Sequence, residues 1–264
     1  MHFNIRAITL DLDDTVWPFA PIGARIEQVL DDWLRIHSPR TAERFPIPAM
    51  RVLREQVFDA HPHLLHDMGA LRRLTLERAF IDSDSDPARI PGMTDAAYDV
   101  FYAERNRVEC YPDALDALAR ISAKLPVAAL SNGNADLVAI GLDHHFAFQL
   151  GAREHGAAKP DPGIFLAACA RLGCAPEEVL HVGDHIEMDV LGAARAGLRT
   201  AWVHRDDAHH PHWPHDDIRP DLIVPDLAAL ADHLDRMHGA TPVSSETLSS
   251  EVHSSRTGSS GTRP

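Results

Sequence analysis

The stretch ITLDLDDTVW, residues 8–17, places three carboxylates, Asp11, Asp13 and Asp14, directly after a run of apolar residues. The pattern at residues 5–10 predicts a buried β-strand. In open α/β sheets, ligands bind outside the carboxyl ends of the strands, and these acids follow such an end. The concentration of negative charge therefore predicts a functional site at this edge of a sheet.

Five further apolar runs have the pattern of buried parallel strands, and they lie at residues 126–131, 146–150, 178–184, 199–204 and 221–225. Apolar residues at three- and four-residue spacing predict helices between them, at residues 111–125, 161–173 and 186–197. The repeated order of strand and helix predicts an α/β fold, in which right-handed crossovers connect a doubly wound parallel sheet.

Residues 17–110 break this order. They contain four amphipathic helical patterns and no clear strand, and these patterns lie at residues 24–37, 49–61, 69–80 and 93–108. We therefore expect an all-helical insertion in a core formed by residues 1–16 and 111–238. Residues 239–264 are rich in Ser, Thr and Gly, and we expect a disordered tail because they bury too little apolar surface to offset ordering.

The composition excludes several classes of partner. The chain has 264 residues, 45% of them hydrophobic, which is enough for an ordinary core. Its 39 acidic and 25 basic residues give a formal net charge of −14, which repels nucleic acids and anionic membranes. The spacing of Cys110, Cys169 and Cys174 favours reduced thiols. Because neither a membrane-length apolar run nor a signal-peptide pattern is visible, we expect a cytoplasmic protein. We expect it to be a monomer or a small homo-oligomer.

Four short motifs fall at or just beyond predicted strand ends. They lie at residues 11–15, 131–134, 159–160 and 183–184, the last with Asp189 five residues beyond it. Carboxylates that meet at one sheet edge resist ionisation unless a cation joins them. A hard, oxygen-seeking cation, most simply Mg²⁺, resolves this accumulation and takes a further ligand from a substrate phosphate. The motifs therefore predict a site for a small phosphorylated metabolite.

Phosphoryl transfer gives each motif a role. Asp11 is the candidate nucleophile, since Mg²⁺ and Lys159 cancel its repulsion from an anionic phosphate. Asp13 can protonate the leaving alkoxide and later take a proton from the hydrolytic water. The hydroxyl of Ser131 and the backbone N–H of Asn132 suit the equatorial phosphoryl oxygens.

Two further acids follow the predicted strand at residues 178–184. Asp184 is the expected distal metal ligand, and Asp189 can hold Lys159 or a metal-bound water. The spacing of Asp184 and Glu187 also fits a helix capping box, which explains both without chemistry. A solvated turn after the first strand, an Asn-Gly turn in the second motif and a surface lysine in the third are the corresponding structural alternatives.

The four motifs, DLDDT, LSNGN, AKP and GDHIEMD, resemble in order those of the haloacid dehalogenase-like hydrolase superfamily, over residues 1–238. The resemblance implies a Rossmann-like core and an aspartyl-phosphate chemistry with Asp11 as nucleophile and Asp13 as acid and base. It also implies Mg²⁺ held by Asp11, the backbone carbonyl of Asp13, and Asp184. The helical insertion is similar to the type 1 cap of that superfamily, a lid over small substrates.

Longer segments resemble a narrower group, the bacterial flavin mononucleotide and 5-amino-6-(5-phospho-D-ribitylamino)uracil phosphatases. They are DLDDTVWP and the segments at residues 61–80, 130–148 and 179–203. This resemblance implies a phosphatase of riboflavin biosynthesis that also hydrolyses other phosphate monoesters. The cap segment matches more loosely than the core segments.

Some residues outside the motifs are candidates for ligand contact. In the helical insertion these are His66, Asp67, Arg72 and Arg73, with the alternative that the arginines pair with acids on an exposed helix face. Trp17 can stack on a substrate ring or pack the linker. Imidazoles that crowd into one stretch predict a solvated loop with adventitious metal binding, and they are His204, His209, His210, His212 and His215.

Three other functions fit parts of this pattern. The 2-haloacid dehalogenases of the same fold attack carbon and need no metal, but they lack the carboxylate that Asp13 provides here. A phosphomutase would retain its aspartyl-phosphate and rebind an intermediate. A non-catalytic binding protein is the third alternative, because fold alone does not fix function.

Overall fold

A six-stranded parallel sheet forms the centre of the molecule in the computed structural model, which describes residues 4–205, 213, 215 and 217–239. The spatial order is β3-β2-β1-β4-β5-β6, and every neighbouring pair is parallel. The strands are β1 (Ala7–Leu10), β2 (Val127–Ser131), β3 (Phe148–Gly151), β4 (Val179–Gly183), β5 (Arg199–Val203) and β6 (Leu222–Val224). The predicted doubly wound α/β fold is confirmed.

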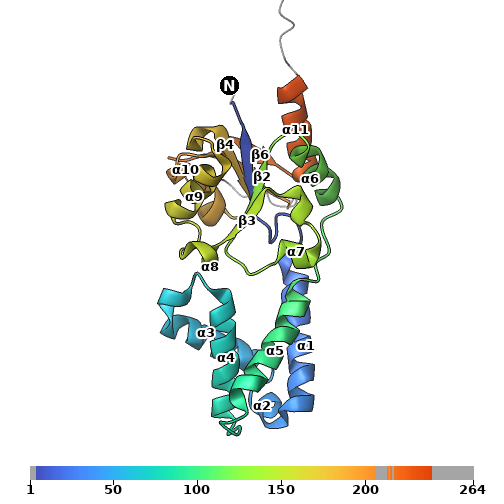
Figure 1. Cartoon of the computed structure of the whole chain (residues 1–264), viewed down its shortest axis with the longest axis vertical. Helices are drawn as coiled ribbons and strands as arrows, with labels where there is room; N and C mark the ends of the chain where they lie inside the picture. The colour runs from blue at the N-terminus through green and yellow to red at the C-terminus, as the bar shows by residue number, and fades with distance from the viewer. Residues whose placement is uncertain (1–3, 206–212, 214, 216, 240–264) are drawn as a thin grey trace, which may run out of the picture.

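Helices cover both faces of the sheet (Figure 1), which explains why its central strands are apolar throughout rather than alternating. One face packs on α9 and α10, and the other on α6 and α11. The helices after the insertion are α6 (Ala114–Ser122), α7 (Leu137–Ile140), α8 (Ala152–His155), α9 (Pro162–Leu172), α10 (Gly192–Arg195) and α11 (Leu227–Gly239). Short 3₁₀ turns occupy Asp143–His145 and Pro176–Glu178.

The helix expected at residues 186–197 is divided in two. Its first part, η4 (Ile186–Leu191), is a π-helical turn, and α10 continues it. The predicted capping box of Asp184 and Glu187 is wrong, since His185 is the N-cap and its side chain accepts from the backbone N–H of Met188. This leaves the Asp184 carboxylate free of a capping role.

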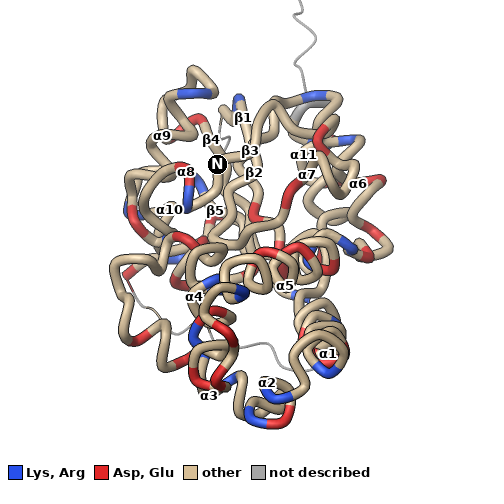
Figure 2. Tube along the Cα trace, turned by 60° about the horizontal axis from the view of Figure 1, so that its bottom comes forward, with Lys and Arg blue, Asp and Glu red and all other residues tan. Residues whose placement is uncertain are grey.

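Five helices between β1 and β2 form a separate lobe below the carboxyl ends of the strands (Figure 1). They are α1 (Phe19–His37), α2 (Pro39–Arg44), α3 (Ile47–Ala60), α4 (Met68–Asp82) and α5 (Ile90–Arg105), with a 3₁₀ turn at Pro62–Leu64. The four predicted helices occur, and the short α2, which starts with Pro39, is additional. These helices carry both acidic and basic positions (Figure 2).

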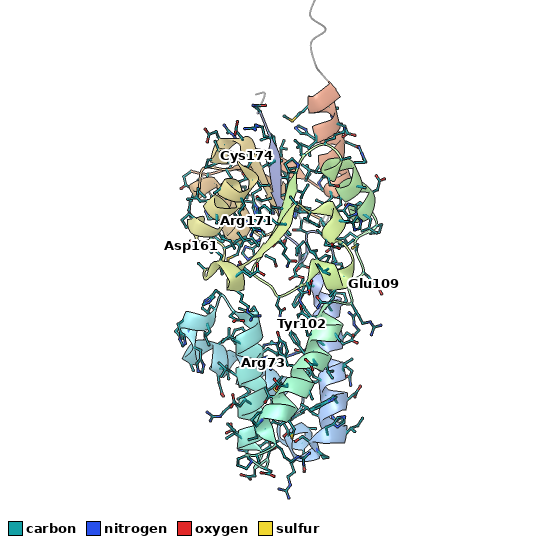
Figure 3. The ribbon with its side chains drawn as sticks, viewed as in Figure 1. Arg73, Tyr102, Glu109, Asp161, Arg171 and Cys174 are labelled. Carbon is teal, nitrogen blue, oxygen red and sulfur yellow. The ribbon has the colours of Figure 1, made fainter. Side chains whose placement is uncertain are left out.

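The two lobes are joined at adjacent points. The backbone N–H of Tyr111 donates to the carbonyl of Val16, so the outgoing and returning segments are hydrogen-bonded to each other. Tyr102 of α5 lies at the junction (Figure 3), and its hydroxyl donates to Asp136 at 3.0 Å. A side chain of helix α5 is therefore hydrogen-bonded to the loop after β2.

Several predictions lie partly or wholly outside the described residues. The predicted tail overlaps them only at Gly239, the last residue of α11, and His209, His210 and His212 are outside them. No helix in the described ranges has the length and apolar character that a bilayer crossing requires. The three cysteines, all within the described ranges, are free thiols.

Candidate active site

A cluster of carboxylates lies at the point where the strand order reverses, between β1 and β4. Asp11 follows β1, Asp184 follows β4 and Asp189 lies in η4. One ligand oxygen of each lies within 4.8 Å of the others. The structure thus brings together the predicted Asp11 and Asp184, and it places Asp189 beside them. The side chain of Asp13 points elsewhere, as described below.

Lys159 is buried at the centre of this cluster. Its Nζ donates to Asp11 Oδ1 at 2.5 Å, to Asp189 Oδ1 at 2.6 Å and to the carbonyl of Leu130 at 3.0 Å. These three bonds use all the donors of an ammonium group. The alternative of a surface lysine is therefore wrong, and Lys159 holds the Asp11 carboxylate in one orientation.

The charges of the cluster do not balance. Three carboxylates against one ammonium leave two negative charges in a largely buried volume. Burial raises the pKa of Asp184 to about 6, with a further contribution from the charge of Asp189. Burial also raises the pKa of Asp11 well above its ordinary value, although Lys159 opposes the shift. Oxygen donors with this excess of negative charge fit a divalent, oxygen-seeking cation.

Asp189 forms hydrogen bonds with several groups around the cluster. Its Oδ1 also contacts His181 Nε2 at 3.1 Å, and its Oδ2 accepts from the backbone N–H of His185 at 3.0 Å. Burial opposes ionisation, but Lys159 and His181 lower the pKa of Asp189 well below its ordinary value. Because most of its lone pairs are occupied, Asp189 is better suited to position Lys159 than to bind the cation directly.

His181 links Asp189 to the sheet. It is buried in β4, and its Nδ1 lies 2.9 Å from the hydroxyl of Thr9 on the neighbouring β1. Burial lowers the pKa of His181, so the imidazole is neutral at physiological pH. The sequence analysis missed this residue, because a single histidine within an apolar strand carries no recognisable signal.

The loop after β2 lies against the same site. The Ser131 hydroxyl accepts from the Gly133 backbone N–H at 3.0 Å, and the Asn132 side chain bonds both backbone groups of Lys159. A Cβ at Gly133 would lie 2.8 Å from Asp13 Oδ2 and 3.0 Å from Arg105 Nη2. Any larger residue at position 133 would press on the ion pair of Asp13 and Arg105, so the glycine lets the loop approach the acid closely.

Asp13 faces two residues at the junction of the lobes. Arg105 Nη2 donates to its Oδ2 at 2.7 Å and to its Oδ1 at 2.9 Å, and Trp17 Nε1 donates to its Oδ1 at 2.8 Å. The indole of Trp17 is completely buried, so it packs the linker and is not open for stacking on a ligand. Arg105, at the end of α5, is a second residue of the site that the sequence analysis missed, since it lies 92 positions from Asp13.

Unpaired donors point to an anionic ligand here. Arg105 Nη1 and Asn134 Nδ2 are buried without a hydrogen-bond partner among the described residues, and both side chains line the same cavity. A buried donor without a partner costs about 1–3 kcal/mol, which an anionic ligand would offset. The unpaired guanidinium nitrogen lies on the residue that holds Asp13.

We expect Arg105→Met to lower kcat about 10- to 100-fold, because Asp13 loses the partner that fixes its position. Steady-state kinetics of Arg105→Met and of Arg107→Met, an exposed arginine paired with Glu104, provide the comparison. In an Asp13→Asn background, Arg105→Met should lower kcat by less than it does in the wild type, because only the contact of Arg105 Nη1 with an anionic ligand then remains to be lost. A full additional loss in that background would show that Arg105 does not act through Asp13.

The residues predicted in the helical lobe divide into two groups. Arg72 lines a cavity of about 890 Å³ that also contacts Asp13, Asn132 and Lys159. Arg73 points between α4 and α5 (Figure 3), where it pairs with Asp95 and lies over the Tyr98 ring. The alternative of an arginine paired on a helix face thus describes Arg73 and not Arg72.

His66 and Asp67 line a separate hollow of about 260 Å³ next to the loop after β2. Asp67 is the N-cap of α4 and accepts from the backbone N–H of Ala70 at 2.8 Å. In the histidine-rich stretch, His215 Nε2 lies 3.1 Å from Glu187 Oε1. Among the described residues, the group that could hold a metal ion is the carboxylate cluster, and no histidine belongs to it.

The fold and the carboxylate site define a hydrolase: the chain belongs to the haloacid dehalogenase-like hydrolase family, whose model matches residues 5–197. The predicted family is therefore confirmed. The chain is 30% identical over 227 residues to the 5-amino-6-(5-phospho-D-ribitylamino)uracil phosphatase YigB of Escherichia coli (strain K12), which covers 86% of this chain and 95% of that protein.

Two other similarities cover different chemistries. The phosphoserine phosphatase of Thermus thermophilus is 39% identical over 157 residues, or 57% of this chain and 61% of that protein. The crystal structure of a 2-haloacid dehalogenase from Pseudomonas syringae pv. Tomato superposes with a TM-score of 0.80 at 33% identity, covering 88% of this chain and 99% of that one. The similarities alone therefore do not distinguish attack on phosphorus from attack on carbon.

Proposed function

We propose that this protein is a Mg²⁺-dependent phosphatase that hydrolyses small-molecule phosphate monoesters through an aspartyl-phosphate on Asp11. The observation that carries the proposal is the Asp11 carboxylate, held by Lys159 at 2.5 Å in a buried cluster where three carboxylates face one ammonium group. A metal-independent attack on carbon does not need this excess of negative charge. The phosphatase names of two relatives support the same reading.

In the first half-reaction, an oxygen of Asp11 forms a bond to phosphorus, and the ester bond between phosphorus and the leaving oxygen breaks. The leaving alkoxide takes a proton from Asp13. In the second, a water gives a proton back to Asp13 and attacks phosphorus, which breaks the bond to Asp11 and releases phosphate. We assign the Ser131 hydroxyl, the backbone N–H of Asn132 and Arg105 Nη1, which has no partner among the described residues, to the phosphoryl oxygens.

Asp11, the backbone carbonyl of Asp13, and Asp184 would hold Mg²⁺, with Asp189 orienting Lys159. The cation would supply charge neutralisation between Asp11 and the substrate phosphate. Thr15 Oγ1 lies 3.1 Å from Asp184 Oδ1 and 3.3 Å from Asp11 Oδ2, so its one hydroxyl proton is shared between the two or donated to either. The Thr15 hydroxyl therefore lies between the two proposed carboxylate ligands.

We propose that helices α1 to α5, within residues 17–110, act as a cap over the core of residues 1–16 and 111–238. Flavin mononucleotide and 5-amino-6-(5-phospho-D-ribitylamino)uracil are the candidate substrates drawn from the resemblance and from the relative in Escherichia coli. We place the enzyme in the cytoplasm, acting on a small metabolite of riboflavin biosynthesis as a monomer or small homo-oligomer. Nucleic acids and membranes are not proposed as partners.

The decisive assay measures phosphate release from a panel of monoesters that includes both candidates, with Mg²⁺ or with chelator. We expect turnover with Mg²⁺ and none with chelator. One parallel assay measures halide release from 2-chloropropionate without metal. Another measures the conversion of a sugar phosphate into its positional isomer, with a sugar bisphosphate present. Halide release without phosphate release would replace the proposal with a dehalogenase, and isomerised phosphate esters without free phosphate would replace it with a mutase.

Metal binding should depend on pH through Asp184. Its pKa of about 6 lies above the ordinary value of 3.8, so its ionised form destabilises the metal-free fold as the pH rises from about 4 to above 6. A cation relieves this destabilisation but must compete with the proton at lower pH. We expect saturating Mg²⁺ to raise the melting temperature by roughly 3 °C more at pH 7.5 than at pH 5. Equal increases in calorimetric scans at both pH values would contradict this role.

A further inference from the structure

The large cavity between the lobes has the opposite charge to the protein as a whole. Five basic and two acidic side chains line it, in a chain with a net charge of −14. Asp13, Arg105 and Lys159 account for its end at the strands. The remaining charged residues form a second group on α1, α3 and α4, and they are Glu27, Arg51, Arg54 and Arg72.

This second group has a surplus of positive charge. Glu27 is shared by two arginines: Arg51 donates to both of its oxygens, at 2.9 and 2.5 Å, and Arg54 Nη1 lies 3.7 Å away. Arg72 forms no hydrogen bond or ion pair with any described residue, and its guanidinium lies over the Phe101 ring at 4.7 Å. A second carboxylate, Asp31, lines a smaller pocket with the same three arginines but is paired with Arg35, so the group keeps a surplus of positive charge.

Arg72 is expensive to keep charged in this position. Burial, together with the charge of Arg54, lowers its pKa to about 10, although Glu27 opposes the shift. Arg72 is partly buried, and the ring of Phe101 replaces only part of the solvation that its guanidinium loses, which leaves its N–H groups without an acceptor among the described residues. Its open edge faces the cavity, where a ligand can supply that acceptor.

We propose that Arg72, with Arg54 beside it, is a second anion subsite that binds a carboxylate or phosphate group at the far end of the substrate from the phosphate that is cleaved. The inference rests on the proposed phosphatase function and, within its substrate class, favours phosphate monoesters with a second anionic group. Phe19, Phe58 and Phe101 give the cavity apolar walls between the two ends. Arg105 and Lys159 remain with the phosphate that reacts.

The volume of the cavity, about 890 Å³, accommodates a ligand much larger than a three-carbon ester. Flavin mononucleotide and the ribitylaminouracil phosphate end in ring systems without a second anionic group. The inference therefore ranks them below esters of similar length that end in a carboxylate.

The test uses pairs of esters that differ only in this group: 6-phosphogluconate with sorbitol 6-phosphate, and 3-phosphoglycerate with glycerol 3-phosphate. We expect the wild type to favour at least one carboxylate of these pairs by about 10-fold or more in kcat/KM. Arg72→Met should reduce that preference to within about 3-fold, through a loss of kcat/KM for the carboxylate ester. The matched control is Arg78→Met, which removes the same charge from the exposed face of α4, where Arg78 pairs with Asp82.

Calorimetric binding of the same pairs to Asp11→Asn, with and without Arg72→Met, separates the two proposals. A binding preference without turnover in the wild type would reject the phosphatase and keep the subsite. Turnover of both esters of every pair at equal kcat/KM would reject the subsite and keep the phosphatase. A preference that survives Arg72→Met in a protein with unchanged melting temperature, or that Arg78→Met also removes, would overturn the assignment to Arg72.

Discussion

Asp11→Asn is expected to lower the rate of phosphate release by about 10⁴-fold or more. The amide cannot form the aspartyl-phosphate, and the remaining groups can act only by positioning substrate. The substitution keeps the shape of the side chain, so it isolates nucleophilicity from packing. Phosphate release by the purified variant, at Mg²⁺ and substrate concentrations that saturate the wild type, gives the ratio directly.

The control is Asp14→Asn, the same substitution three positions further on. Asp14 is exposed, and its Oδ1 accepts from the backbone N–H of Phe19 at 2.8 Å, a bond that an Asn oxygen can also accept. Its backbone φ of 57° lies in the left-handed region, which Asn tolerates well. We expect its activity within about 2-fold of the wild type. Substantial phosphate release by Asp11→Asn would remove Asp11 from the role of nucleophile.

Lys159→Met is expected to lower the free energy of unfolding by about 3–5 kcal/mol. The substitution preserves an unbranched apolar stem but leaves Asp11 and Asp189 as buried carboxylates without their cation. Burial disfavours the charge of Lys159, yet these two carboxylates raise its pKa, so the pair interactions outweigh the cost of desolvation in the folded protein. Urea unfolding at pH 7.5 in the presence of chelator measures the change.

A second substitution tests whether the unpaired charge is the cause. Lys159→Met combined with Asp189→Asn removes both the cation and one of its carboxylates, so it should unfold at a higher urea concentration than Lys159→Met alone. If the double variant is as unstable as the sum of the two single variants, the loss comes from packing rather than from an uncompensated charge. Phosphate release should be low in both variants, because Asp11 loses its partner.

The sequence predicted the parts of this molecule that depend on local pattern. Each strand is a short apolar run, and the acids that follow β1 and β4 meet because parallel strands end at the same edge of the sheet. Asp11, Lys159 and Asp184 could therefore be placed together without a structure. The short α2 was missed, because six residues carry too little periodicity to register.

The residues that could not be predicted act across long separations. Arg105 meets Asp13 only because α5 returns to the point where the chain left the core, and no spacing in the sequence encodes this contact. Arg72 and Arg73 are neighbours of the same type, yet one faces the cavity and the other pairs with Asp95. Successive positions on a helix point about 100° apart, so only the packing of α4 decides between them.

Asp13 is held from both places where the chain crosses between the lobes. Trp17 stands on the outgoing segment and Arg105 on the returning one. In the proposed mechanism Asp13 is the proton donor, so a change in the angle between the lobes would displace the donor together with these two residues. An ester that held the lobes apart would then meet a displaced donor even when tightly bound. The proposed mechanism therefore predicts that the size of the substrate changes kcat independently of affinity.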